Sequence, residues 1–321
     1  MIAVTGAAGF IGSVLLAKLN ERGEKDVLVV DTLGSDGKFR NLGAKQFRDI
    51  VDPDVFASQL EAGDTSPDAI LHIGAITDTG ERDGDLVLDR NTRYTRRLAV
   101  TAMERGIRFI YASSASVYGD GSLGFSDDPT LTGKMRPLNP YAFSKWRFDC
   151  EATDNGWADR IVGLRFFNVF GPNEYHKARM ASVIWHAYRQ VQETGKLQLF
   201  ESHRPDYAHG EQSRDFIYVM DVVDTVLWFL DNAGVNGIYN LGTGTARTFN
   251  ALAASLFAAV GREPAIEYIP TPDTFRSSYQ YFTEADLTRL RAAGYTRPFT
   301  PLEEATADYV QRFLMKPDPY C

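Results

Sequence analysis

Short apolar blocks and helical periodicity alternate along the first half of the chain. Compact apolar runs are typical of buried parallel strands, whereas apolar residues that recur every three or four positions indicate amphipathic helices. The predicted strands are Ile2–Val4, Val27–Val30, Ala69–Ile73, Arg108–Ala112 and Ile161–Phe166, and the predicted helices include Gly12–Arg22, Leu86–Arg105 and Pro140–Asp154. Repeated strand–helix units predict an α/β fold with a Rossmann-type, doubly wound parallel sheet.

The pattern becomes irregular after Pro172. The elements expected there are helices at Met180–Glu193, Val219–Asn232 and Phe249–Val260, with short strands at Leu197–Phe200 and Glu267–Ile269. The polar segment Ser202–Ser213 contains Pro and Gly and predicts an exposed loop. We therefore expect a nucleotide-binding domain over residues 1–170 and a smaller mixed α/β substrate-binding domain over residues 171–321. The chain is expected to cross back to the first domain around residues 214–245.

Composition and charge exclude several classes of protein. The 321 residues are 44% hydrophobic and 24% charged, as in an ordinary globular protein. The net charge of −8 offers no basic surface for nucleic acid or an anionic membrane, and no apolar run is long enough to span a bilayer. A core strand begins at Ile2, so no signal peptide is expected. Neither the two cysteines nor the histidines show metal-ligand spacing, which predicts no metal and a reducing cytoplasm.

Three glycines join the first predicted strand to the first predicted helix. The first N–H groups and the dipole of a helix favour an anion, and glycine lets the backbone approach a phosphate closely. The second strand ends at Asp31, about where an acid that binds a ribose hydroxyl is expected. A plain strand–helix connection is the alternative. We expect a dinucleotide to contact Gly6, Gly9, Phe10, Ile11, Gly12 and Asp31.

The strongest chemical signal is the pair Tyr141 and Lys145, four residues apart on a helix that opens with Pro140. A phenol with a pKa of about 10 is a poor base at neutral pH, and a nearby ammonium lowers that pKa. The pair is therefore a candidate general base for an alcohol that loses hydride. Ser114 follows a buried strand and could donate to the substrate oxygen. A solvated helix face and a serine-rich strand end are the alternatives.

Together these segments resemble the extended branch of the short-chain dehydrogenase/reductase family. The matching segments are TGAAGFIG at 5–12, SSASVYG at 113–119, YAFSK at 141–145, RFFNVFGP at 165–172, RDFIYVMDVVD at 214–224 and YNLGTG at 239–244. The resemblance implies a catalytic triad of Ser114, Tyr141 and Lys145, with Lys145 also holding the nicotinamide ribose. It also implies that Asn168 contacts the substrate and that Arg214 grips a nucleotide-sugar pyrophosphate.

Two more polar residues are expected at the cofactor site, since the resemblance places the loop of His72 beside the cofactor and Asn91 near the active-site tyrosine. His72 ends the third predicted strand, and Asn91 lies on the following helix. The alternatives are a packed residue at the end of a strand and a surface asparagine.

Further segments narrow the resemblance to ADP-L-glycero-D-manno-heptose 6-epimerases. They are VDTL with KFRNL at 30–42, EYHKARMAS at 174–182, YQYFTEADL at 279–287 and RAAGY at 291–295. Dehydratases of the family usually carry Asp-Glu where this chain has Ala115 and Ser116. The resemblance implies that the C6″ hydroxyl of ADP-heptose, a lipopolysaccharide-type heptose, is oxidised to a ketone and then reduced on the opposite face. Lys177 is the candidate proton donor for that second face, and a solvated loop lysine is the alternative.

The remaining expectations concern the substrate and the cofactor. Ser182, Phe200 and Tyr279 are expected to contact the substrate, with Phe200 near the adenine or else ending an apolar strand. Asp31 favours NAD, whereas the resemblance places Lys38 at a 2′-phosphate, so NADP is expected with NAD as the alternative. The segment Asp49–Asp54 is acidic, reads as a loop and offers no second lysine.

Two other functions compete with the 6-epimerase. One is a UDP-hexose 4-epimerase or another nucleotide-sugar member of the family, and typical 4-epimerases lack an equivalent of Lys177. The other is a catalytically silent NADP-binding regulator, which the complete triad disfavours. We also expect a homo-oligomer.

Overall fold

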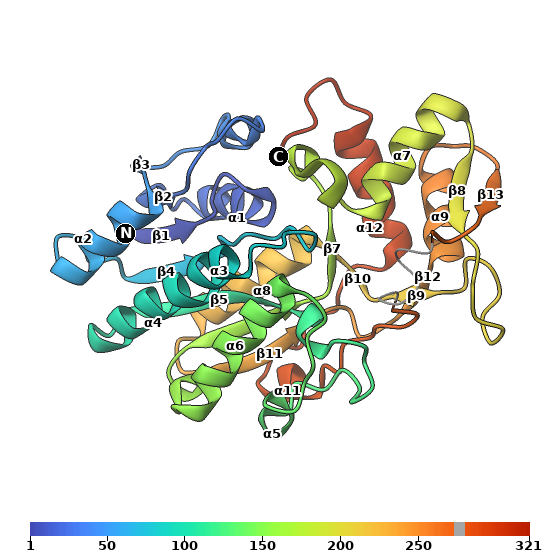
Figure 1. Cartoon of the computed structure of the whole chain (residues 1–321). Coiled ribbons are helices and arrows are strands. Elements are labelled where there is room, and N and C mark those ends of the chain that lie inside the picture. The colour runs from blue at the N-terminus through green and yellow to red at the C-terminus, as the bar shows by residue number, and fades with distance from the viewer. Residues whose placement is uncertain (273–279) are drawn as a thin grey trace.

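The computed structural model describes residues 1–272 and 280–321 and has a seven-stranded parallel sheet at its centre (Figure 1). In spatial order its strands are β11 (Gly237–Leu241), β6 (Val162–Phe166), β5 (Arg108–Ser114), β4 (Ala69–His72), β1 (Ile2–Thr5), β2 (Val27–Val30) and β3 (Asp49–Val51). Every neighbouring pair runs parallel. The winding direction reverses between β1 and β4, and this reversal confirms the predicted doubly wound sheet.

Successive side chains of a strand point to opposite faces of the sheet, so each strand has two apolar faces to bury. A different set of helices covers each face. Val4 and Val29 face α1 and α8, whereas Ala3 and Val30 face α2, α4 and α6. The bounds of these helices are α1 (Phe10–Glu21), α2 (Pro53–Ala62), α4 (Tyr94–Glu104), α6 (Pro140–Asp154) and α8 (Val219–Asp231). Both faces are therefore covered at the centre of the sheet, which explains why β1, β2 and β4 are mainly apolar rather than alternating.

Capping explains where the helices begin. The side chain of Asn139 accepts a hydrogen bond from the backbone N–H of Ala142 at 2.8 Å, and Pro140 occupies the first turn of α6. Asp52 caps α2 in the same way, and β3 runs directly into it. The expected loop at Asp49–Asp54 is therefore wrong, because a three-residue edge strand is too short to show a periodicity.

The helix expected at Leu86–Arg105 is interrupted. It consists of α3 (Gly84–Val87), a π-helical turn η2 (Leu88–Arg93) and α4. The widened turn carries Asn91, whose side chain points back toward the loop after β4.

The second half of the chain forms a smaller body beside the sheet, on the right of Figure 1. There β8 (Leu197–Phe200) pairs in parallel with β13 (Ile266–Ile269). The helices around this pair are α7 (Val183–Thr194), α9 (Phe249–Ala259) and α12 (Leu302–Tyr309), extended by the π-helical turn η6 (Val310–Leu314). Their shared core contains Val191, Leu199 and Phe257. Between these parts the chain returns to the sheet as α8 and β11, within residues 214–245.

Short elements complete the described chain. They are the 3-10 helices η1 (Lys38–Leu42), η3 (Ala115–Tyr118), η4 (Trp157–Asp159) and η5 (Tyr175–Met180), the helices α5 (Pro129–Thr132) and α11 (Thr288–Ala292), and the strand pairs β7 (Asn168–Phe170) with β10 (Phe216–Tyr218) and β9 (Ser213–Arg214) with β12 (Arg247–Thr248). Within residues 1–272 and 280–321 no helix has the length and apolarity needed to cross a membrane.

Candidate functional site

A cavity of about 700 Å³ opens where β1, β2 and β4 end. This is the edge at which doubly wound sheets bind ligands. Eight of the predicted site residues line it: Gly6, Gly9, Phe10, Ile11, Gly12, Asp31, Lys38 and Lys177.

The glycines make the floor of this cavity. Gly6 has a φ of +67°, and a Cβ added there would lie 2.6 Å from the Cα of Gly74. A Cβ on Gly12 would lie 2.1 Å from the carbonyl oxygen of Gly6. In the described chain no side chain caps α1 and no acidic residue lies in its first turn, so its first N–H groups face the cavity without an internal anion. This cradle fits the pyrophosphate of a dinucleotide.

The end of the cavity beyond β2 is dominated by an ion pair. The Nζ of Lys38 donates to Asp31 at 2.8 Å, and the other carboxylate oxygen of Asp31 accepts the backbone N–H of Ala8, also at 2.8 Å. Both side chains are largely buried. The two residues that compete in the choice between NAD and NADP are therefore in direct contact.

Ser114, Tyr141 and Lys145 meet at the end of β5. Ser114 opens η3, its hydroxyl accepting from the Ser116 hydroxyl at 2.9 Å, and it is hydrogen bonded to Tyr141. The buried Nζ of Lys145 donates to the Ala112 carbonyl at 2.7 Å. Burial lowers the pKa of Lys145 to about 8, against the opposing charge of Asp149.

The pKa of Tyr141 differs from the sequence-based expectation. Burial raises it, and the hydrogen bond to Ser114 opposes that rise only in part. Among the described residues, Lys145 does not lower the pKa of Tyr141 as expected. Its ammonium is engaged by the Ala112 carbonyl, and desolvation of the phenolate is the larger effect.

His72 and Asn91 lie behind the cavity wall rather than in it. The two ring nitrogens of His72 bond to the hydroxyls of Thr5 (2.6 Å) and Thr95 (2.8 Å), and burial lowers its pKa to about 3. The amide of Asn91 exchanges two hydrogen bonds with the backbone of Ile76 and donates a third to the Ser144 hydroxyl. Their polar groups are thus used to hold the β4 loop and α6 in place.

Lys177 reaches the cavity from a constrained segment. It lies in η5, where the following Ala178 has a φ of 46°, and its Nζ is 5.7 Å from the centre of the Phe10 ring. Burial lowers the pKa of Lys177, and the charge of Glu174 opposes this.

Buried Glu174 closes this segment on itself. Its carboxylate accepts from the backbone N–H of Ser182 at 2.5 Å, from the Ser182 hydroxyl at 2.7 Å and from the Tyr309 hydroxyl at 2.9 Å. Ser182 also caps α7, so its hydroxyl is already committed to protein groups. The expected substrate contact by Ser182 therefore has no support in the geometry.

The other predicted substrate residues lie apart from this cavity. Asn168 is exposed at the start of β7, and Phe200 ends β8. Arg214 donates to the backbone carbonyls of Ser213 and Gln280. Tyr279 falls outside the described residues.

Sequence reasoning missed several residues at the cavity. Asp78 and Met180 line it, and Arg179 donates to Asp78 at 2.5 Å, joining the loop after β4 to η5. His176 also faces the cavity and contacts the Asn41 amide at 3.3 Å. No motif in the sequence revealed the bridge between Asp78 and Arg179. No group of three or more His, Cys, Asp or Glu in the described ranges is arranged to hold a metal ion.

Comparisons with known proteins agree with this geometry. The profile of the NAD dependent epimerase/dehydratase family matches residues 2–242. The ADP-L-glycero-D-manno-heptose-6-epimerase of Nitratidesulfovibrio vulgaris is 50% identical over 322 aligned positions that cover 100% of both chains.

Two solved structures are also similar. The Helicobacter pylori ADP-L-glycero-D-manno-heptose-6-epimerase superposes with a TM-score of 0.81 at 30% identity, covering 97% of this chain and 95% of that one. A Thermus thermophilus UDP-glucose 4-epimerase in complex with NAD gives 0.74 at 26% identity, with 97% of each chain covered. The chain therefore belongs to the NAD dependent epimerase/dehydratase family, which confirms the resemblance inferred from its motifs.

Proposed function

We propose that this enzyme inverts C6″ of ADP-D-glycero-D-manno-heptose to give ADP-L-glycero-D-manno-heptose. Full-length similarity to epimerases of that name supports the substrate. The observation that carries the proposal is the position of Lys177, which lines the same cavity as the glycine cradle. An inversion at one carbon needs a second proton-transferring group besides Tyr141, and Lys177 is the candidate for it.

The glycine cradle would hold a nicotinamide cofactor, which would supply a hydride acceptor for C6″ and then a hydride donor for the ketone. Once its own proton has left to solvent, the Tyr141 phenolate takes the proton of the C6″ hydroxyl, and the hydrogen bond to Ser114 orients its ring. Lys145 holds the nicotinamide ribose. Lys177 exchanges the proton on the other face of the ketone, since burial lowers the pKa of its amine toward neutral pH.

For the cofactor we propose NADP. Lys38 lines the cavity beyond the end of β2, and Asp31 is already engaged by Lys38 and by the Ala8 N–H. A 2′-phosphate would draw the ammonium of Lys38 away from Asp31. The acidic lining residues Asp36, Asp52 and Asp54 act against this choice. For the substrate, we propose that Asn168 contacts the sugar and that Arg214 binds the pyrophosphate of the ADP-heptose.

The direct test is to incubate the protein with ADP-D-glycero-D-manno-heptose and, separately, with UDP-galactose, resolving the epimers by NMR. We expect interconversion of the two ADP-heptoses and no conversion of the UDP-sugar. Conversion of UDP-galactose alone would replace this proposal with a 4-epimerase.

The two-base mechanism is tested by Lys177→Met, which keeps the aliphatic stem and removes the amine. We expect epimerisation to be abolished while ADP-sugar binding persists, with Lys196→Met on an exposed lysine as the control. Some half-reaction chemistry should survive with an aldehyde analogue, and adding Tyr141→Phe should remove it. If Lys177→Met epimerises at the wild-type rate, a single base must serve both faces of a substrate that rotates within the site.

A further inference from the structure

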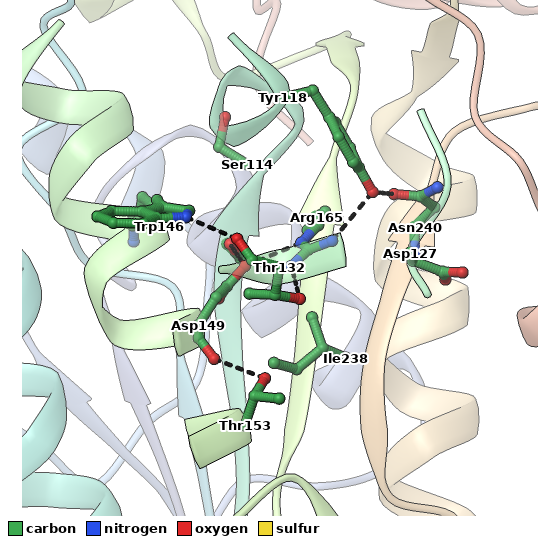
Figure 2. Close-up of polar contacts among 12 residues, drawn as sticks. Ser114, Tyr118, Asp127, Thr132, Trp146, Asp149, Thr153, Arg165, Ile238 and Asn240 are labelled. Carbon is green, nitrogen blue, oxygen red and sulfur yellow. Dashed lines mark hydrogen bonds and ion pairs between the residues drawn. The ribbon is translucent and has the colours of Figure 1, made fainter. Parts of the chain in front are cut away.

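A fully buried ion pair lies one layer beneath the catalytic groups. The Nε of Arg165 donates to a carboxylate oxygen of Asp149 at 2.9 Å, and both side chains are 0% exposed (Figure 2). Desolvating two charges costs as much as or more than their attraction returns, so such a pair is weak support for stability alone. The importance of the pair therefore lies in what it holds in place.

The remaining polar atoms of the two partners bind residues of three further elements. Asp149, on α6, accepts the hydroxyls of Tyr111 and Ser113 from β5, both at 2.9 Å. Arg165, on β6, donates to the hydroxyls of Tyr118 in η3 at 3.1 Å and Thr132 in α5 at 3.2 Å.

The network continues to the far edge of the sheet. Tyr118 donates to the Asn240 side chain in β11 at 2.6 Å, as Figure 2 shows. The helix with Tyr141 and Lys145 and the strand end with Ser114 are thus tied to the same two charges.

Lys145 is the catalytic group closest along the chain to this pair. It lies one helical turn before Asp149, so the two side chains leave α6 on the same face. Its Nζ binds the carbonyl of Ala112, which stands in β5 between the two residues bonded to Asp149. The carboxylate and the ammonium are therefore anchored on one stretch of strand.

We propose that Asp149, fixed by Arg165, is the positioning residue that sets the location and the charge state of Lys145. The inference deepens the proposed function, because it rests on Lys145 acting there as an ammonium that holds the cofactor ribose.

The other titratable groups around Lys145 do not replace Asp149. Burial lowers the pKa of His72 on β4 to about 3 and raises the pKa of Tyr111 well above its usual value, so both are neutral near pH 7. Tyr141 is also held in its neutral form by burial, and Arg165 carries a positive charge. Within the described chain, Asp149 is the group whose charge keeps Lys145 protonated against desolvation.

The test is Asp149→Asn, which keeps the shape of the side chain and removes its charge. Cofactor affinity, followed by fluorescence titration with NADPH, and kcat are measured from pH 6 to pH 10. In the wild type both should fall as pH rises through the pKa of Lys145. In Asp149→Asn we expect the midpoint of that fall to move down by on the order of one pH unit. Asp149→Glu should restore the wild-type midpoint at a reduced rate.

Thr153→Ala is the matched control. It removes a neutral hydrogen bond to the Asp149 backbone carbonyl, shown in Figure 2, and should leave the midpoint unchanged. If Asp149→Asn fails to fold, Asp149→Asn combined with Arg165→Gln leaves no buried guanidinium without its carboxylate and should show the same downward shift. A wild-type midpoint in either neutralised variant would overturn the proposal. The cofactor titration needs no heptose, so it tests the positioning role of Asp149 separately from the proposed function. If the midpoint of cofactor binding shifts in Asp149→Asn but the wild-type protein does not epimerise ADP-heptose, the proposed function is refuted and the positioning role stands.

Discussion

The phenol of Tyr141 is the group on which the chemistry depends most directly. Tyr141→Phe keeps the ring and removes the proton acceptor that is hydrogen bonded to Ser114. We expect turnover to fall by about 10²–10⁴-fold, with unfolding temperature and cofactor affinity close to wild type. Steady-state rates beside a thermal melt check this. Near-normal turnover by a folded variant would remove Tyr141 from the mechanism.

Lys38 tests the choice of cofactor. In Lys38→Ala the ammonium that pairs with Asp31 is lost, so a 2′-phosphate would meet an unneutralised carboxylate. A charge-assisted contact of this kind is worth about 1.5–3 kcal/mol, so NADP affinity should drop by roughly tenfold or more while NAD affinity holds or improves. Isothermal titration with both cofactors decides the matter. Equal weakening of the two would show that Lys38 does not read the phosphate.

At the residue scale, the sequence was a better guide to which residues lie near the cavity than to the contacts that their side chains make. The glycines, Asp31, Lys38 and Lys177 line one cavity, and the predicted triad meets at the end of β5 outside that lining. His72 and Asn91 do not face it, because their hydrogen bonds are taken by Thr5, Thr95, Ile76 and Ser144. A motif identifies a position, but only the packed structure shows whether a polar group there is still free to bind a ligand.

Among the elements, η5 has an unusual backbone, because Ala178 within it has a φ of 46°. Glu174→Gln should destabilise this segment, because an amide NH₂ would face the hydroxyls and the N–H that now donate to the carboxylate. We expect a loss of about 1–3 kcal/mol in the free energy of unfolding and a larger fall in kcat than in cofactor affinity. Urea titration and kinetics measure both.

Tyr309→Phe is the companion to that variant. It removes one of the donors to Glu174 and leaves the carboxylate in place, so it should cost about 1 kcal/mol and spare most of the activity. If Glu174→Gln matches it in both respects, the carboxylate does not organise the segment.

Prediction of elements succeeded where the periodicity was long. The helix at Pro140–Asp154 has the expected bounds because cap, proline and apolar spacing all agree there. The strand β3 and the π-helical turn in front of α4 were missed. A strand of three residues has almost no pattern, and a π-turn is set by what its side chains bind, which here is the loop after β4.

At the scale of the whole molecule, His72 makes stability depend on pH. Its pKa falls from 6.5 to about 3 on folding, so below pH 6.5 the unfolded chain takes up a proton that the folded chain cannot. The free energy of unfolding should therefore decrease as the pH drops, and by pH 5 this histidine should account for about 2 kcal/mol of the loss.

His72→Gln provides the measurement. Urea unfolding at pH 8 and pH 5 should show a loss in this variant that is smaller by about that amount, whatever its stability at pH 8. His186→Gln, which removes an exposed histidine from α7, serves as the control. An unchanged pH dependence in His72→Gln would mean that other groups cause the acid sensitivity.

The return of the chain to the sheet as β11 sets the order in which this molecule can be completed during synthesis. When residue 170 has left the ribosome, β6 is still an open strand edge, and the partner that covers it lies 70 residues further along. Asn240, which bonds to Tyr118, arrives on that same late strand. The nascent nucleotide-binding half must therefore wait, exposed to pairing with other chains, until nearly half of the remaining chain has been translated.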